Sequence, residues 1–527
     1  MPRPGRILLT LASAALYTAS FPPWNCEGLV WIALVPFLLA LRGATLLRAT
    51  LLGLLWGVAM IWGVGMWLPR ALGDYYQQPL WFGLLFGAVS SVYFIGLYYA
   101  AFAASAVWIT SGARGVARVL SLSVLWVAWE LIRSRFLTGD PWLLIGYALA
   151  PRPLLMQAAD LGGVYVLSFV VILVNAAVSE ALTAARDGVS RWAPVGLAAA
   201  VVVADVLYGS LRLSMPLPLE PRVPVVVVQG NNDMGAQWRN EFYGQGLAEY
   251  IRLSYEAAPR DRHSLIVWPE SAITFFVADE PNYLHQVGRM LAAANADLIL
   301  GGPYKDVGPE GERYYNSAFY VTADGRIADR YDKGHLLPFA EYFPLRTVEF
   351  LRRQFERVRY FTAGRGDDPL STRFGDVATV ICFEGMFPEI VAEQTRRGAS
   401  LLLNLSNDAW LGGGAGPEQH LMMIPVRAVE NRVWAIRATT TGISAIVDPY
   451  GRIVARSPLD QVSVLQSEVV PISIDTPYKS VGDLFAWICL GLSGMAALLR
   501  MFAGWSGSAD GGRIAVHTNR RAQRTVP

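Results

Sequence analysis

Charged residues are scarce in this chain of 527 residues. Asp, Glu, Lys and Arg make up 16% of it, whereas hydrophobic residues make up 53%. This ratio excludes an ordinary soluble protein and predicts that part of the chain contacts lipid. The formal net charge is only +2, and no Lys or Arg cluster occurs in the predicted folded part. A nucleic-acid partner is therefore excluded, because phosphate binding needs such clusters.

Cysteine and histidine are also rare, with three and five residues. Cys26 and Cys489 lie in apolar stretches, where a thiol usually behaves as a small hydrophobic group. A disulfide framework is therefore not expected. The few His and Cys residues show neither paired metal-ligand spacing nor a His-Glu-x-x-His helix. We expect no metal and no cofactor.

Long apolar runs are what the sequence has instead. About 20 apolar residues of helix cross a bilayer core, and runs of this kind predict eight membrane spans. They lie at 6–22, 25–41, 49–68, 80–109, 117–132, 163–184, 193–213 and 484–503. We interpret the stretch 136–160 as interfacial, with Trp142 and Tyr147 at the level of the lipid headgroups.

The texture of the sequence divides the chain into four parts. Residues 1–220 form an N-terminal transmembrane helix bundle of about seven spans, and residues 221–475 have the mixed polar and apolar elements of a globular domain. Residues 484–503 form a C-terminal transmembrane helix. The polar stretch 504–527 is predicted to be a disordered cytoplasmic tail.

Arginines in the short loops predict the orientation. Cytoplasmic loops of membrane proteins carry an excess of Lys and Arg, and most of the loop arginines fall on one side of the predicted bundle. This set is Arg3, Arg6, Arg42, Arg48, Arg114, Arg118, Arg186 and Arg191, joined by Arg513, Arg520, Arg521 and Arg524 in the tail. The globular domain is then expected on the opposite side, which is the periplasm if the source is bacterial. Arg133, Arg135 and Arg152 do not fit this pattern, because they lie on the predicted outer side. Contact with anionic lipid headgroups would give them a function.

Short apolar strands alternate with amphipathic helices in the globular part, which predicts an α/β sandwich. Strands are expected at 223–229, 264–268, 297–301, 314–321, 326–331, 377–383, 400–405, 433–439 and 442–448. Helices are expected near 242–257, 281–295, 388–397 and 418–431.

Three ionisable residues follow separate predicted strands, where an α/β sheet presents its reactive groups. Glu270 follows an apolar strand and the rigid Trp268-Pro269 step, so burial could raise its pKa toward that of a general base. Lys333 could donate to a developing oxyanion, and Cys382 ends a strand rich in β-branched residues. Each alone has an ordinary interpretation, as a loop carboxylate, a surface ion pair or an inert buried thiol. Their combination favours catalysis.

These segments resemble the Glu-Lys-Cys triad of the nitrilase, or carbon-nitrogen hydrolase, superfamily. The resemblance covers roughly 223–470 and rests on Trp-Pro-Glu at 268–270, the Lys-x-His-Leu-x-Pro-Phe-x-Glu-Tyr stretch at 333–342, and Cys-x-Glu at 382–384. Further matches are Tyr-Asn-Ser at 315–317, Ser-Asn-Asp-Ala-Trp at 406–410 and Arg-Ala-Val-Glu-Asn at 427–431. With helices on both sides of this domain, the whole chain resembles the apolipoprotein N-acyltransferases. The implied fold is a membrane helix bundle of about eight spans plus an αββα sandwich.

The resemblance also implies roles for individual residues. Cys382 is the nucleophile, Glu270 the general base and Lys333 the stabiliser of the tetrahedral intermediate, with Glu341 and Glu384 as supporting carboxylates. Trp238 corresponds to an aromatic residue of a substrate-contacting loop, and Trp410 could belong to a lipid-facing wall. Phe383 stands where the family usually has Tyr, so a hydroxyl is lost, while the backbone N–H at 383 remains. Leu411 likewise replaces a more usual Phe.

The implied reaction is a two-step acyl transfer without a cofactor. The acyl donor is a membrane phospholipid and the acceptor is a diacylated apolipoprotein, at a bacterial inner membrane with the catalytic domain on the periplasmic side. Two alternatives stay open. One is a membrane-tethered amidase that hydrolyses a small nitrogen compound, and the other is a transporter or scaffold with an inactive domain. The spans contain few charges that would mark a transport path, apart from Glu27 and Glu130.

Overall fold

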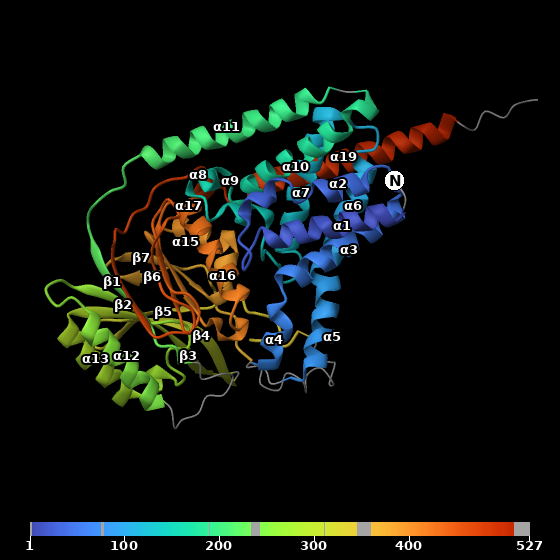
Figure 1. Cartoon of the computed structure of the whole chain (residues 1–527). Helices are drawn as coiled ribbons and strands as arrows, with labels where there is room; N and C mark the ends of the chain where they lie inside the picture. The colour runs from blue at the N-terminus through green and yellow to red at the C-terminus, as the bar shows by residue number, and fades with distance from the viewer. Residues whose placement is uncertain are drawn as a thin grey trace, which may run out of the picture.

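The computed structural model describes residues 3–74, 78–188, 190–232, 243–309, 311–344 and 360–510. Helices from both ends of the chain form one part of the molecule, and two β-sheets with their covering helices form the other (Figure 1). The helical part contains six helices that are long and apolar enough to cross a membrane in the described residues. The protein is therefore a multi-pass membrane protein.

The six candidate spans agree with six of the eight that the sequence predicts. They are Leu46–Val64, Leu80–Ile109, Gly115–Arg135, Val164–Ala185, Trp192–Ser214 and Leu484–Phe502. The corresponding elements are α3 (Leu46–Val64), α5 (Leu80–Ser90) joined to α6 (Leu97–Ile109) by the π-helix η2 (Ser91–Gly96), α7 (Gly115–Arg135), α10 (Val164–Asp187), α11 (Trp192–Ser214) and α19 (Leu484–Asp510). The last helix continues past the predicted start of the tail at residue 504, and residues 511–527 lie outside the described part of the chain.

The first predicted span keeps its length but lies three residues earlier in the chain, and the second is interrupted. Helix α1 (Arg3–Ala19) has 17 residues and stops shortly before Pro22 and Pro23. The run 25–41 is not one helix, because η1 (Glu27–Trp31) ends before α2 (Val35–Leu41) begins. Pro36 lies in the first turn of α2, where a backbone N–H has no partner within the helix, so its missing N–H costs no hydrogen bond. For the same reason it cannot continue a helix that begins before it.

The interpretation of the stretch 136–160 as interfacial stays a prediction. Within this stretch, residues 143–150 are buried, whereas Phe136, Leu137 and Arg152 are exposed. The stretch contains η3 (Ile145–Leu149), α8 (Pro153–Met156) and α9 (Ala159–Gly162), and Tyr147 has no exposed surface. Arg427 of the globular domain donates to the Tyr147 hydroxyl at 3.0 Å, and the Trp142 indole donates to Gln419 at 3.1 Å. Tyr147 and Trp142 thus both contact the globular domain.

Arginine side chains gather at both ends of the bundle with different partners. At the end away from the sheets, Arg42 and Arg118 both pair with Glu180. The three arginines on the predicted outer side also pair with acidic residues of the protein. The pairs are Arg133 with Asp140, Arg135 with Glu389 and Asp483, and Arg152 with Glu27. These arginines therefore have acidic partners within the protein, and their expected contact with headgroups stays a prediction.

The globular part is an αββα sandwich of two six-stranded sheets, as expected. The first sheet has the order β12-β1-β2-β3-β4-β5 and the second the order β11-β10-β9-β8-β7-β6. The first contains β1 (Val223–Gln229), β2 (Ser264–Val267), β3 (Ala296–Gly308), β4 (Gly311–Val321), β5 (Ile327–Asp332) and β12 (Ser463–Val469). The second contains β6 (Leu370–Thr372), β7 (Gly375–Ile381), β8 (Leu401–Ser406), β9 (Trp434–Thr439), β10 (Ala445–Val447) and β11 (Ile453–Arg456).

Alternation along the strands explains the layers. Val223, Val225 and Val227 of β1 pack between the two sheets, whereas Val226 and Val228 point to the other face. That outer face is covered by α12 (Tyr243–Ala257) and α13 (Pro281–Ala294), and the second sheet is covered by α15 (Pro388–Arg396) and α17 (Met423–Asn431) (Figure 1). Side chains with a period of two residues thus fill three apolar layers.

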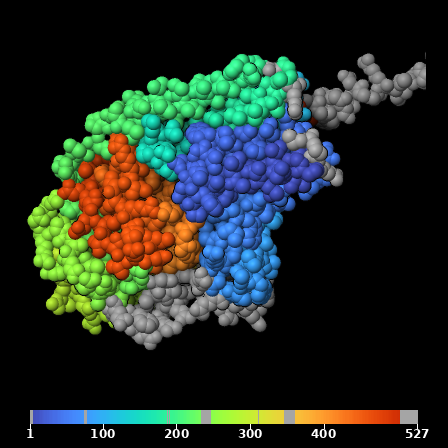
Figure 2. All heavy atoms as spheres, viewed as in Figure 1, coloured from blue at the N-terminus to red at the C-terminus, as the bar shows by residue number. Residues whose placement is uncertain are grey.

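The sandwich packs directly against the helix bundle, and Figure 2 shows the two parts in contact over a broad face. Gln419 of α16 (Ala415–Leu421) is fully buried at this contact. Its amide nitrogen donates to the carbonyls of Pro22 and Val64, both at 2.9 Å, and its oxygen accepts from the indoles of Trp67 and Trp142. One side chain therefore ties the globular domain to four separate places in the membrane part.

Candidate active site

Three turns at the carboxyl ends of strands bring Glu270, Lys333 and Cys382 together. Glu270 follows β2, Lys333 follows β5, and Cys382 follows β7, which runs parallel to β8. Cys382 interacts electrostatically with both other groups. All three are buried, and Lys333 is only 1% exposed, so it is not a surface lysine.

The Glu270 carboxylate is held by donors from both sheets. Asn316 of β4 donates to its Oε1 at 2.7 Å, and the backbone N–H of Asn407, just after β8, donates to its Oε2 at 2.7 Å. Gly301 of β3 makes this position possible, because a Cβ there would lie 2.6 Å from the Glu270 Cα. Burial raises the pKa of the Glu270 carboxyl, although the Lys333 ammonium opposes the rise. A buried carboxylate of this kind is suited to accept a proton.

Lys333 is paired with Glu341. The Nζ lies 2.8 Å from Glu341 Oε2, and the other oxygen of Glu341 accepts from Asn316 at 2.8 Å. Burial alone would lower the pKa of Lys333, but the Glu341 and Glu270 carboxylates hold it above its usual value. Lys333 therefore carries its charge at neutral pH, as a group that stabilises an oxyanion must.

Cys382 opens the short 3₁₀ helix η6 (Cys382–Met386) and has a positive φ of 57°. Burial raises the pKa of its thiol above the usual value, and the Glu270 carboxylate adds to this effect. The thiol is therefore protonated at rest, and a nearby base must remove its proton before the sulfur can attack.

Glu384 joins the turn that carries Lys333 to the turn that carries Cys382. Its Oε1 accepts from the backbone N–H groups of Gly334 and His335, and its Oε2 accepts from Ile381 N–H and the Tyr331 hydroxyl, at 2.8 to 3.0 Å. Burial raises the pKa of Glu384 to about 7. This carboxylate therefore fixes the distance between the two turns, and it also interacts electrostatically with Lys333.

An apolar cavity of about 270 Å³ is lined by Phe383, the residue that follows Cys382. The membrane part contributes Trp62, Trp67, Phe86 and Phe94, and the globular part contributes residues 337–340, Phe383, Met386 and Trp410. Phe383 also lies beside the catalytic lysine candidate, with the Lys333 Nζ 5.1 Å from its ring centroid. The cavity therefore runs from the membrane helices to the residue that follows Cys382.

The sequence analysis missed several residues of this site. Asn316 was quoted only as part of a motif, although it bridges Glu270 and Glu341. An amide in the middle of an apolar strand was the available signal, because a buried amide needs partners. Trp67 and Trp142 gave no such signal, since their place beside the cavity depends on contacts between distant segments. Trp238 lies outside the described residues, which also contain no group of three or more His, Cys, Asp and Glu arranged for a metal ion.

Comparison with known proteins gives two matching families. Residues 227–475 match the carbon-nitrogen hydrolase family, and residues 13–177 match the apolipoprotein N-acyltransferase N-terminal domain. The apolipoprotein N-acyltransferase of Geobacter metallireducens is 35% identical over 500 residues, which cover 93% of this chain and 94% of that protein. The apolipoprotein N-acyltransferase of Azotobacter vinelandii is 34% identical over 534 residues, covering 99% and 96%.

Among solved structures, the globular part is similar to Saccharomyces cerevisiae Nit3, a member of branch 10 of the nitrilase superfamily. The sequence identity is 20% and the TM-score 0.37, and the match covers 51% of this chain and 97% of that one. A carbon-nitrogen hydrolase from Helicobacter pylori G27 matches with 17% identity and a TM-score of 0.37, covering 47% of this chain and 89% of that one.

Proposed function

Because this chain belongs to the apolipoprotein N-acyltransferase family, we propose that it transfers an acyl chain from a membrane phospholipid to the N-terminal amine of a diacylated apolipoprotein. The observation that carries this proposal is that Glu270, Lys333 and Cys382 meet beside a cavity whose other wall is made by membrane helices. A carboxylate, an ammonium and a thiol in this arrangement support nucleophilic acyl transfer.

In the first step, Glu270 takes the proton of the Cys382 thiol as the sulfur attacks the ester carbonyl carbon of the phospholipid. The negative oxygen is stabilised by the Lys333 ammonium and the backbone N–H of Phe383. The ester C–O bond then breaks, and the leaving alkoxide takes the proton from Glu270 and departs as lysophospholipid. The acyl chain remains on Cys382 as a thioester.

In the second step, the free α-amino group of the apolipoprotein attacks the thioester carbonyl. Glu270 accepts the proton that the amine loses, the C–S bond breaks, and that proton passes to the departing Cys382 thiolate. The products are an amide and the resting thiol, so the residues return to their initial state without any other reactant.

The cavity favours a lipid donor over a small soluble substrate. Extracting an acyl chain into water costs about 0.8 kcal/mol per CH₂ group, whereas Trp67, Phe86, Phe383 and Met386 offer an apolar wall to that chain. Trp410 makes an edge contact with Trp67, with ring centroids 5.7 Å apart, and thus closes the same wall from the globular side. We assign substrate contact to Trp410 and, by resemblance, to Trp238.

The proposal is tested by intact mass of the purified protein after incubation with a phospholipid of one defined acyl chain. We expect an increase by one acyl group in the wild type and in Cys26→Ala and Cys489→Ala, and none in Cys382→Ala. A diacylated lipopeptide with a free N-terminal amine should discharge the adduct, whereas its N-acetylated counterpart should not. An adduct without Cys382 contradicts the mechanism, and rapid discharge by water alone contradicts the transferase in favour of a hydrolase.

We further propose that the protein resides in the bacterial inner membrane with its catalytic domain in the periplasm. The excess of loop arginines at the bundle end away from the sheets, Arg42 and Arg118 among them, supports a cytoplasmic location of that end. The test uses single cysteines at exposed positions in a background in which Cys26, Cys382 and Cys489 are all replaced by Ala. In intact cells with a permeable outer membrane, a membrane-impermeant maleimide should label Val462→Cys in the globular domain and spare Ser190→Cys. The reverse pattern contradicts the orientation.

A further inference from the structure

The backbone of Cys382 is held in a conformation that L-residues rarely adopt. Its φ is 57°, and Cys has no side-chain oxygen that could stabilise this region, as Asn and Asp have. A strained residue of this kind persists only where its surroundings fix it. On the preceding side, Glu384 accepts from the N–H of Ile381 at 2.8 Å. The carbonyl of Cys382 needs a contact of its own to fix the residue on the other side.

Asn404, a fully buried residue of β8, supplies that contact. Its amide nitrogen donates to the Cys382 carbonyl at 3.1 Å and to the Val380 carbonyl at 3.3 Å. Its amide oxygen accepts from a guanidinium nitrogen of Arg437 on the neighbouring strand β9. Because a guanidinium can only donate, it fixes which end of the amide faces Cys382. The orientation of Asn404 is thus set by Arg437.

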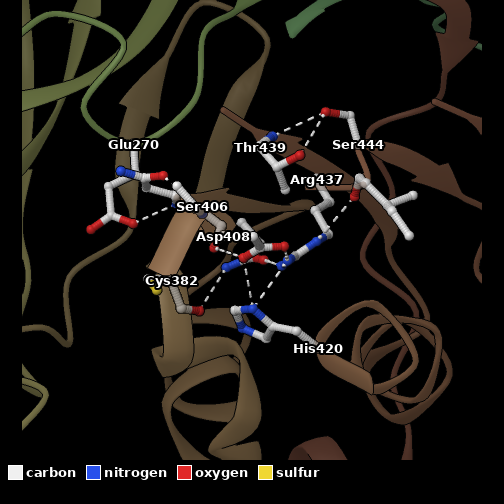
Figure 3. Close-up of polar contacts among 12 residues, drawn as sticks. Glu270, Cys382, Ser406, Asp408, His420, Arg437, Thr439 and Ser444 are labelled. Carbon is white, nitrogen blue, oxygen red and sulfur yellow. Dashed lines mark hydrogen bonds and ion pairs between the residues drawn. The ribbon is translucent and has the colours of Figure 1, made fainter. Parts of the chain in front are cut away.

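Arg437 is fixed in turn by Asp408. The second guanidinium nitrogen lies 2.6 Å from Asp408 Oδ2, and Asp408 Oδ1 contacts His420 Nδ1 at 2.9 Å and the Ser406 hydroxyl at 2.7 Å (Figure 3). Burial disfavours the charge on Asp408, but Arg437 and His420 hold the pKa of its carboxyl below the usual range. Arg437, Asp408 and His420 have no exposed surface beyond 1%.

The same turn also reaches the general base. Asn407 precedes Asp408, and its N–H is the donor at 2.7 Å to Glu270 Oε2. The hydrogen bonds that fix Asp408 therefore fix the backbone that orients Glu270 as well. In this way one buried chain of polar groups contacts the carbonyl of the nucleophile at one end and the carboxylate of the base at the other.

We propose that Asn404, oriented by the Arg437–Asp408–His420 chain, is a positioning residue that holds the Cys382 backbone so that its sulfur faces Glu270 and Lys333. The inference rests on the proposed function, in which Cys382 is the nucleophile. Asn404 contacts no reacting atom, and its contribution is to the geometry of attack. Misplacement of a reacting group by about 1 Å can cost about 100-fold in rate.

The sharpest test is Asn404→Asp. Aspartate has nearly the same shape and keeps an oxygen for Arg437, but its second oxygen would face the Cys382 carbonyl without a proton to donate. We expect the rate of thioester formation in a single turnover with phospholipid to fall by about 100-fold, with the phospholipid KM changed less than twofold. Asn404→Ala should have a similar effect on the rate.

The matched control is Asn431→Ala. Asn431 is also fully buried, bonds to Thr395 and to the Arg427 carbonyl, and has no contact with Cys382 among the described residues. It should lower the melting temperature by about as much as Asn404→Ala and leave the acylation rate within about threefold of wild type. If Asn404→Asp and Asn404→Ala slow acylation no more than this control, or change only KM, the positioning role is refuted. If wild-type protein forms no adduct on Cys382, the proposed function fails instead.

Discussion

Asn316 offers the most direct test of the electrostatics of the site. Its amide nitrogen donates to Glu270 at 2.7 Å and to Glu341 at 2.8 Å, so both carboxylates depend on one side chain. Replacing it with Leu keeps the branching at Cγ and removes both donors. A hydrogen bond to a charged group contributes about 1.5–3 kcal/mol, and this contribution favours the ionised form of Glu270.

The loss can be expressed as a pKa shift. One pKa unit corresponds to about 1.4 kcal/mol, so removal of the Asn316 donor should raise the pKa of Glu270 by about 1–2 units. Burial already raises this pKa, and the variant moves it further in the same direction. Glu270 must be ionised to take the thiol proton, so the acylation rate increases as pH rises through its pKa. In Asn316→Leu this increase should occur about 1–2 pH units higher than in wild type.

The assay is the pH profile of single-turnover thioester formation, followed by quenched-flow sampling and intact mass. The control is Ser317→Ala at the next position of β4, whose hydroxyl donates to Asp332 at 2.6 Å rather than into the site. The control should keep the wild-type profile. If the acid limb of Asn316→Leu coincides with that of Ser317→Ala, then Asn316 does not set the ionisation of Glu270 and the reasoning is refuted.

Three further changes test other contacts. Glu384→Gln should slow acylation by about tenfold or more and lower the free energy of unfolding by about 1–3 kcal/mol, because the single amide oxygen cannot accept on both turns, from Ile381 N–H and from Gly334 N–H. An unchanged melting temperature and rate would exclude this. Gln419→Leu removes four hydrogen bonds to the membrane part and should raise the phospholipid KM more than it lowers kcat, measured by lysophospholipid release; a pure kcat effect would contradict a role at the cavity. Gly301→Ala places a Cβ 2.6 Å from Glu270 Cα and should reduce acylation strongly while Gly246→Ala, with open space at its Cβ, should not; equal activities would refute the close-packing argument.

Local patterns predicted most of the sandwich because its strands are short and apolar. β1 was predicted with the bounds that the structure has, and the strand ends that carry Glu270 and Cys382 were within two residues. The predicted helix 418–431 is instead two helices, α16 and α17, with a break at Met422. Pro425 explains the break, because it has no N–H for the carbonyl of Leu421 and its ring crowds that carbonyl.

Long-range pairing explains what the sequence analysis missed. β12 pairs antiparallel with β1 from more than 230 positions away, and its half-exposed residues do not form a distinct apolar run. β3 was predicted to end at residue 301 but continues to Gly308 as a hairpin with β4, through polar positions such as Lys305 and Asp306. In this part of β3, backbone hydrogen bonds to β4 maintain the strand without full burial of its side chains. The hydropathy of residues 304–308 therefore does not predict a strand.

The roles of Glu341 and Glu384 illustrate the same limit within the site. Resemblance implied that both support catalysis, yet their sequence positions alone did not distinguish their partners. Glu341 pairs with the Lys333 ammonium, whereas Glu384 binds backbone N–H groups on two turns. The contact of Glu341 stabilises the charge of Lys333, whereas the contacts of Glu384 fix the distance between two turns. Only the coordinates distinguish these two roles.

The resting state of the proposed triad also bears on the choice between amine and water as acceptor. Burial raises the pKa of the Cys382 thiol and of Glu270, so the thiol is protonated at rest and becomes a nucleophile only when Glu270 takes its proton. Once the acyl chain is on Cys382, its apolar length can occupy the cavity lined by Trp67, Phe383 and Met386. Water gains little by entering such an apolar cavity. A lipoprotein amine, by contrast, is attached to acyl chains that partition into apolar surroundings. Apolar surroundings therefore favour aminolysis, because the lipid-linked amine enters them more readily than water does. The same three residues would serve a hydrolase.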